Sequence, residues 1–203
     1  MNEKLLIRIS AVFGIIFPVL ALFLIFLLGS LIPGYSHTQD YISSIWRAGS
    51  ELQILSLMLL VIMGGIFFVF SLGFYLAIDE DKYSYYNLIL LITFSLSLIF
   101  LGVFPCPGDC MDNGFTVHFL FTIIACASLG FSPLLLYFVT EQDKNWKDYE
   151  KLNWVVFFLS IVLLFLYMLF EPYKGLFQRL YFFLCFFWVG VISIKLFKLS
   201  KTK

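Results

Sequence analysis

Six long apolar stretches dominate this sequence and fix the class of fold open to it. They cover residues 5–32, 52–78, 88–104, 115–139, 152–170 and 176–196. A helix of about 20 apolar residues crosses a hydrocarbon core about 30 Å thick, and other backbone arrangements leave peptide groups unpaired in lipid. Hydrophobic residues make up 62% of the chain and charged residues 13%, unlike a soluble domain. The sequence therefore predicts an all-α, polytopic membrane protein, with residues 1–203 forming one six-helix transmembrane bundle.

Basic residues are distributed unequally between the two ends of the predicted helices. Ten of the 13 Lys and Arg residues lie near the chain termini or in the loops after the second and fourth spans. The others are Arg47, Lys174 and Arg179. Because cytoplasmic segments are enriched in Lys and Arg, we expect both termini in the cytoplasm of a cell-membrane protein. Loops 33–51, 105–114 and 171–175 are then expected outside.

Several function classes find no support in the sequence. Between their ends the spans carry no Asp, Glu, Lys or Arg, whereas ion and proton carriers usually place such residues along their pathway. A Gly-x-Ser-x-Gly elbow, a His-Glu-x-x-His motif and a Gly-rich phosphate loop are all missing. No basic or aromatic pattern suited to nucleic acid is present. We therefore expect the functional chemistry in the three outer loops.

The loop between the third and fourth spans carries two cysteines. Cys106 and Cys110 flank Pro107-Gly108, a dipeptide suited to the centre of a type II turn, which brings the sulfur atoms within bridging distance. Outside the cytoplasm a disulfide is the favoured interpretation, with free thiols or metal ligation as alternatives. A lone Cys-x-x-x-Cys supplies too few ligands for a closed zinc site.

The residues that open the fourth span suit a helix start. Asn113 can cap the helix, and the carboxylate of Asp112 is then favoured near the positive end of the helix dipole. His118 follows about one turn into the helix, at a membrane depth where histidine is unusual. Two interpretations of His118 stay open, a hydrogen-bonded structural residue and a residue that binds a ligand or metal or transfers a proton.

The other two outer loops are also rich in hydrogen-bonding groups, and the only other histidine, His37, lies in the first. Arg179 is a charge at membrane depth, expected to pair with an acidic residue, to hold an anionic headgroup or to snorkel to the interface. Its possible acidic partners are Asp40, Asp109, Asp112 and Glu171. Because the loops share one face, we expect one ligand-binding pocket there. Its predicted residues are His37, Asp40, Tyr41, Ser43, Asp109, Asp112, His118, Gln178 and Arg179.

Three outer motifs resemble those of the six-helix prokaryotic membrane proteins grouped as domain of unknown function 998. They are residues 35–43 (Tyr-Ser-His-Thr-Gln-Asp-Tyr-Ile-Ser), the Phe104-Pro105-Cys106…Asp109…His118 stretch, and residues 175–180 (Gly-Leu-Phe-Gln-Arg-Leu). The resemblance covers all six spans and implies a fold and a shared site, without an activity. It gives Asp40, Ser43, His118 and Arg179 as the first positions of that site, while Trp46 replaces an expected small residue.

More distant resemblances concern the loop at residues 40–43 and the histidine that opens the fourth helix. Both are similar to features of the six-helix autophagy modulators and of the membrane proteins of lipid-anchor remodelling. The ceramidase-like intramembrane hydrolases use three histidines on zinc, but this sequence has 2 histidines, so the same chemistry needs a substitute ligand.

Two function hypotheses follow from the outer face. In the first, the pocket binds a lipid headgroup or small amphiphile, with membrane lipids as partners, no nucleic acid and no cofactor. In the alternative, His37, His118 and Asp40 hold zinc in a hydrolase or lipid-modifying enzyme. A metal bound by the purified protein but not by a His37→Ala/His118→Ala variant separates the two. The sequence makes no prediction of oligomeric state.

Overall fold

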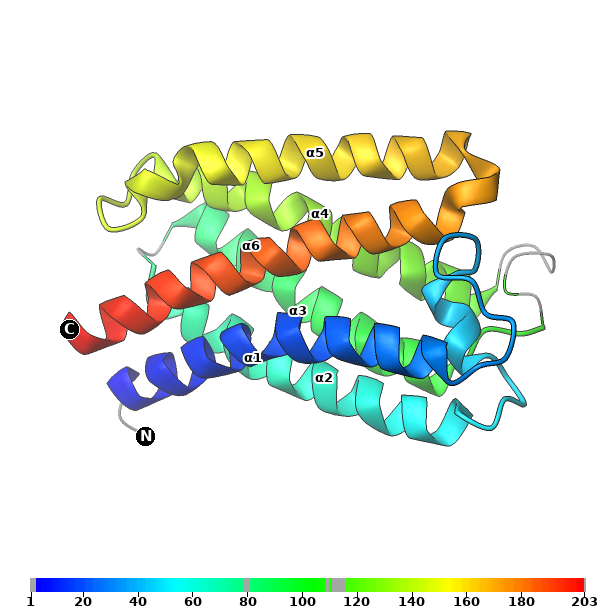
Figure 1. Cartoon of the computed structure of the whole chain (residues 1–203). Coiled ribbons are helices and arrows are strands. Elements are labelled where there is room, and N and C mark those ends of the chain that lie inside the picture. The colour runs from blue at the N-terminus through cyan, green and yellow to red at the C-terminus, as the bar shows by residue number, and fades with distance from the viewer. Residues whose placement is uncertain (1–2, 79–80, 109, 111–115, 203) are drawn as a thin grey trace.

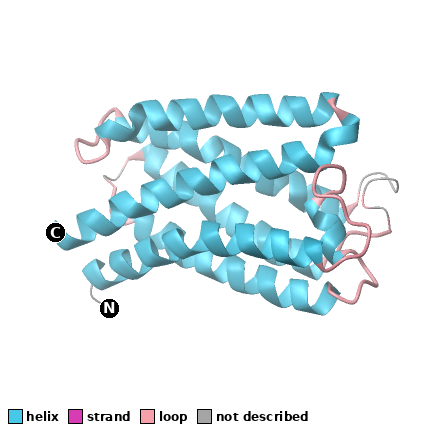
Figure 2. Cartoon of the chain, in the orientation of Figure 1, coloured by secondary structure: helices cyan, strands magenta, loops and turns pink. Residues whose placement is uncertain are grey.

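Six long helices run side by side along the molecule (Figure 1). They are α1 (Glu3–Ser30), α2 (Gln53–Tyr75), α3 (Lys82–Val103), α4 (Val117–Thr140), α5 (Glu150–Leu169) and α6 (Lys174–Thr202). The short 3-10 helices are η1 (Ile42–Trp46), η2 (Lys147–Tyr149) and η3 (Glu171–Tyr173). The computed structural model describes residues 3–78, 81–108, 110 and 116–202, and these contain no strand (Figure 2). All six long helices are apolar enough to cross a membrane, which confirms the predicted all-α multi-pass membrane protein.

The helices form a ring in chain order. Each long helix packs against the next one in the chain, and α1 packs against α6 to close the ring. Both termini lie at the same end of the bundle (Figure 1). We call the opposite end, which carries the α1–α2, α3–α4 and α5–α6 connections, the distal end. The three motifs singled out in the sequence all lie there, while the side of the membrane that it faces stays a prediction.

Capping side chains set the starts of two helices. The carboxylate of Asp81 accepts the Ser84 backbone N–H at 2.6 Å, and the Asp81 N–H donates to the Ser84 hydroxyl at 2.9 Å. This capping box starts α3 at Lys82, ahead of the apolar span predicted from residue 88. In α4 the N-cap is Thr116, whose hydroxyl accepts the Phe119 N–H at 3.1 Å. The cap expected from the sequence, Asn113, lies outside the described residues.

A cluster of phenylalanines fills the middle of the ring. Phe17 of α1 packs edge-to-face on Phe67 of α2 and Phe186 of α6, with ring centroids 4.8 and 5.1 Å apart. Phe67 in turn packs on Phe94 of α3 at 4.7 Å. All four side chains are buried, so one aromatic cluster joins four helices.

Two adjacent glycines in α2 have opposite surroundings. A Cβ atom at Gly64 would lie 2.8 Å from the Ser95 carbonyl oxygen of α3, and the Ser95 hydroxyl donates to the Gly64 carbonyl at 2.8 Å. A Cβ atom at Gly65 would have no described atom within 4 Å. Gly64 therefore allows α2 and α3 to approach closely, as small residues do between membrane helices, whereas Gly65 faces away.

This contrast gives a matched pair of variants. We expect Gly64→Ala to lower the free energy of unfolding by about 1–3 kcal/mol, because the added methyl group meets backbone that cannot move aside cheaply. Gly65→Ala should leave stability unchanged or raise it, since alanine forms helices better than glycine. Thermal unfolding of the two variants in detergent measures the difference. Equal shifts of the two midpoints would contradict the assigned α2–α3 contact.

Candidate functional site

Arg179 attaches the first distal loop to the beginning of α6. Its Nη1 donates to the backbone carbonyls of Asp40 and Gly175, each at 2.8 Å, and its Nη2 donates to the Tyr35 hydroxyl. The Arg179 side chain is only 7% exposed. A Cβ atom at Gly175 would lie 2.4 Å from the Asp40 carbonyl oxygen, so glycine is needed where the loop meets the helix. Arg179 thus binds the backbone of Asp40 rather than its carboxylate.

Two more hydrogen bonds hold the same loop on α6. The Leu176 N–H donates to the Thr38 carbonyl at 2.9 Å, and the Ile42 N–H donates to the Gln178 side-chain oxygen at 2.8 Å. The first and third sequence motifs are therefore in direct contact, as the sequence implied.

The carboxylate of Asp40 has a local partner. It accepts the Ser36 backbone N–H at 2.6 Å, and the Asp40 N–H donates to the Ser36 carbonyl at 2.8 Å. Because this pair closes a turn within the loop, the carboxylate stabilises the loop conformation. Glu171, another proposed partner of Arg179, pairs instead with Lys174 at 2.8 Å.

A groove of about 300 Å³, which we call the lateral groove, lies between α1 and α6 beside this loop. Its walls are apolar and include Phe26 and Phe183, which are exposed on the side of the bundle. Its polar lining comes from His37, Thr38 and Arg179. Two buried atoms of this lining, His37 Nδ1 and Arg179 Nε, have no hydrogen-bond partner among the described residues.

A second cavity of about 100 Å³, the interior cavity, lies inside the ring toward its distal end. Phe17 and Phe186 of the aromatic cluster line it, as do Ser43 and Trp46 near its distal side. His118, 4% exposed, also lines it. Most of its lining residues therefore differ from those of the lateral groove.

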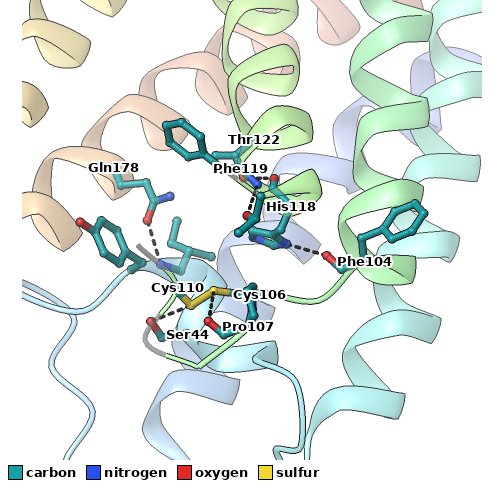
Figure 3. Close-up of a disulfide and its surroundings, with 12 residues drawn as sticks. Ser44, Phe104, Cys106, Pro107, Cys110, His118, Phe119, Thr122 and Gln178 are labelled. Carbon is teal, nitrogen blue, oxygen red and sulfur yellow. Dashed lines mark hydrogen bonds between the residues drawn. A yellow bond between two sulfur atoms is a disulfide. The ribbon is translucent and has the colours of Figure 1, made fainter. Parts of the chain in front are cut away.

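The hydrogen bond of His118 fixes which ring nitrogen carries the proton. His118 Nδ1 lies 2.8 Å from the Phe104 backbone carbonyl (Figure 3). A carbonyl oxygen can only accept, so Nδ1 is the donor, and Nε2 of the neutral ring keeps a free lone pair. Within the described part of the chain this buried Nε2 has no partner.

The predicted disulfide between Cys106 and Cys110 is confirmed, with Cα atoms 5.0 Å apart. The turn is closed by the Cys110 N–H on the Pro107 carbonyl at 3.0 Å, one residue further along the chain than expected. The Cys106 carbonyl accepts the Ala48 N–H at 2.8 Å, and the Ser44 hydroxyl donates to the Cys110 sulfur at 3.7 Å (Figure 3). The second and first distal loops are thereby joined.

The structure divides the predicted pocket between two cavities. His37 and Arg179 line the lateral groove. Three other residues of the predicted set, Ser43, His118 and Gln178, line the interior cavity. Ile25 and Phe182 line both cavities and stand between them.

Two described residues of the predicted set, Tyr41 and Asp40, fall outside both linings. The ring of Tyr41 packs against Tyr167 of α5, with centroids 6.3 Å apart. Asp40 has the local role given above. Asp109 and Asp112 lie outside the described residues.

The residues proposed for zinc do not come together. His37 and His118 line different cavities, and the carboxylate of Asp40 is bound within its own loop. No three His, Cys, Asp or Glu side chains in residues 3–78, 81–108, 110 and 116–202 form a group that could hold a metal ion.

Sequence reasoning missed one partner of Arg179, Tyr35, and two residues that line the interior cavity, Trp46 and Ser56. Tyr35 belongs to the first motif, and its position beside a histidine-containing turn was a usable signal. Trp46 looked like a departure from a family pattern, yet its indole lines the interior cavity. Ser56, 1% exposed, is one of two serines in an apolar span and carries no sequence signal.

The family of the chain follows from a comparison with family models. The model described as "Protein of unknown function (DUF998)" matches residues 15–195. The chain belongs to the DUF998 family. The matched region includes all three distal motifs and both cavities, so the DUF998 region contains the whole candidate site. No curated protein and no solved structure matches the chain.

His37 gives this DUF998 chain a pH-dependent contribution to stability. Burial lowers the pKa of His37 below its ordinary value of 6.5, and the positive charge of Arg179 lowers it further. The folded state therefore favours the neutral ring. That contribution to stability is fully present above the unfolded pKa and is lost as the pH falls through 6.5 toward the lower folded pKa.

We expect His37→Gln to weaken the loss of thermal stability between about pH 7 and about pH 5, because glutamine does not titrate. Unfolding midpoints in detergent across this range measure the slope. Gln39→Ala, a change at an exposed neighbour in the same loop, should keep the slope of the parent. Parallel curves for the parent and His37→Gln would contradict the assigned environment of His37.

Proposed function

We propose that this protein of the cell membrane binds an anionic lipid in its lateral groove, with the headgroup at Arg179 and an acyl chain between α1 and α6. The observation that supports this most is the buried guanidinium of Arg179. The one ion pair formed among the described residues joins Lys174 to Glu171, so Arg179 has no carboxylate partner there.

The hydrogen bonds of Arg179 leave capacity for a ligand. A guanidinium has five N–H donors. Arg179 uses three, on two backbone carbonyls and the Tyr35 hydroxyl. Its Nε–H has no partner among the residues that the structure describes. Buried charge is costly unless it is paired, and arginine matches phosphate oxygens well. An anionic headgroup supplies the missing negative charge.

The shape of the lateral groove suits a lipid molecule. Its polar residues belong to the distal loop and the beginning of α6, and its apolar walls continue along α1 and α6. The exposed rings of Phe26 and Phe183 stand where a membrane protein meets lipid. A lipid lying there places its headgroup at the loop and its chain against the helices.

The expected orientation of the chain and the charge state of His37 define the lipid further. The excess of Lys and Arg at the end that holds the termini supports a distal end outside the cell, so the lipid belongs to the outer leaflet. Because the pKa of His37 is lowered, His37 is neutral near pH 7 and Arg179 is the cation of the groove. A headgroup with a single negative charge complements it.

Native mass spectrometry of protein taken from mixed phosphatidylglycerol and phosphatidylcholine membranes tests the proposal. We expect the parent to retain phosphatidylglycerol preferentially. Arg179→Gln should reduce that retention at least about tenfold, because a charge-assisted phosphate contact is lost. Lys174→Gln, which removes a nearby basic residue outside the groove, should retain lipid like the parent.

A second variant separates ligand binding from folding, because Arg179 also holds the distal loop. Leu22→Trp adds bulk to the groove from α1 and leaves the Arg179 contacts intact. It should displace phosphatidylglycerol while keeping the unfolding midpoint measured in lipid-free detergent. The proposal is overturned if the parent shows no preference for phosphatidylglycerol, or if Arg179→Gln and Leu22→Trp both retain it like the parent.

A further inference from the structure

We propose that the interior cavity is a separate binding site for the hydroxyl end of a neutral lipophilic alcohol. It is distinct from the lateral groove in its lining, its charge and the ligand that it fits. Two residues, Ile25 and Phe182, line both and form the partition between them.

The lining of the interior cavity excludes a charged ligand. No Asp, Glu, Lys or Arg occurs among its described lining residues. Most of the wall is hydrocarbon or aromatic, including Phe17, Leu28, Met63 and Phe186. An ion placed there loses its hydration and gains no counter-charge, which is strongly unfavourable. A neutral, mainly apolar molecule does not carry this penalty.

Three residues of the lining each carry a buried polar atom that has no hydrogen-bond partner among the described residues. These atoms are Nε2 of His118, Nε1 of Trp46 and the hydroxyl oxygen of Ser56. His118 is 4% and Ser56 1% exposed. Buried polar groups in native proteins nearly always have a partner, so three unpartnered polar atoms on residues that line one cavity indicate a bound polar group.

The donor and acceptor roles of these atoms select a hydroxyl group. His118 donates through Nδ1 to the Phe104 carbonyl, so its Nε2 can only accept while the ring is neutral. The indole Nε1–H of Trp46 can only donate. A hydroxyl group donates to the first and accepts from the second. A ketone or ester carbonyl accepts only, and leaves His118 Nε2 unsatisfied.

The size of the cavity limits how much of the ligand it encloses. An apolar cavity of roughly 150 Å³ binds a molecule the size of benzene. This cavity has about 100 Å³, enough for a hydroxyl group and a short length of hydrocarbon. Water can hydrogen-bond to the polar atoms but not to the apolar rest of the wall. A hydrocarbon chain packs well against that apolar part. The ligand is either a membrane lipid with a free hydroxyl group or a small soluble alcohol.

A brominated alcohol tests the site directly, because bromine quenches tryptophan fluorescence at short range and Trp46 is in the wall. We expect 6-bromo-1-hexanol to give saturable quenching of the full chain in detergent. Trp46→Phe should remove the saturable part, and Trp154→Phe, a change on the exposed surface of α5, should keep it. We expect 1-bromohexane and 6-bromohexanoate to bind at least about fivefold more weakly, since one lacks the hydroxyl group and the other is charged.

Variants within α2 provide a matched control. Ser56→Ala should weaken the alcohol about fivefold, as loss of one hydrogen bond does. Ser71→Ala should have no effect, because the Ser71 hydroxyl is buried in the same helix but donates to the Phe67 carbonyl at 2.8 Å. Ala21→Leu should abolish binding by occupying the cavity, with its folding checked by thermal unfolding.

Competition identifies the source of the alcohol. Displacement of the probe by dioleoylglycerol indicates a membrane alcohol, and displacement by 1-hexanol alone indicates a small soluble one. The proposal is overturned if quenching does not saturate, which is the result for a cavity that holds only water. It is equally overturned if 1-bromohexane or 6-bromohexanoate binds as tightly as the alcohol, or if Ser56→Ala and Ser71→Ala behave alike.

Discussion

Both cavities depend on the contacts that Arg179 makes with backbone carbonyls. By binding the Asp40 and Gly175 carbonyls, its guanidinium seats the first distal loop on α6, so residues of that loop become part of both walls. His37 then lines the lateral groove, and Ser43 and Trp46 line the interior cavity. A positive charge is well suited to this role, because one guanidinium satisfies several carbonyls that lipid would leave unpaired. Its Nε–H, which has no partner among the described residues, is the donor assigned to the proposed lipid.

The distribution of side-chain volume explains why the interior cavity lies where it does. In the middle of the ring, phenylalanines from four helices meet face to edge and fill the space. Toward the distal end the lining also includes small or polar residues, such as Ala21, Ser43, Ser56 and Thr122. The ring is therefore filled by aromatic side chains at its middle, and it contains a cavity with some polar lining residues toward its distal end.

The sequence predicts the helices well, because an apolar segment surrounded by lipid must form all its backbone hydrogen bonds internally, as a helix does. It also favours the disulfide, and the family resemblance implies that the outer motifs belong together. It does not predict the division of the site, because loop positions show which residues share an end of the bundle, whereas helix rotation decides which cavity each one lines. Rotation of α4 turns His118 into the ring, while His37 lies outside it. The Asp40 carboxylate accepts the Ser36 N–H of its own turn, and Arg179 binds the Asp40 backbone carbonyl instead.

The closure of the ring by α1 and α6 has a consequence for biosynthesis. A chain inserted from its N-terminus presents α1 long before α6 leaves the ribosome. Until then the seam between the two helices is open, and neither the lateral groove nor the wall that Phe182 and Phe186 contribute to the interior cavity exists. The insertion intermediate with five helices in place therefore exposes the inner face of α1 to lipid. Both proposed ligand sites are therefore complete only once the sixth helix has joined the bundle.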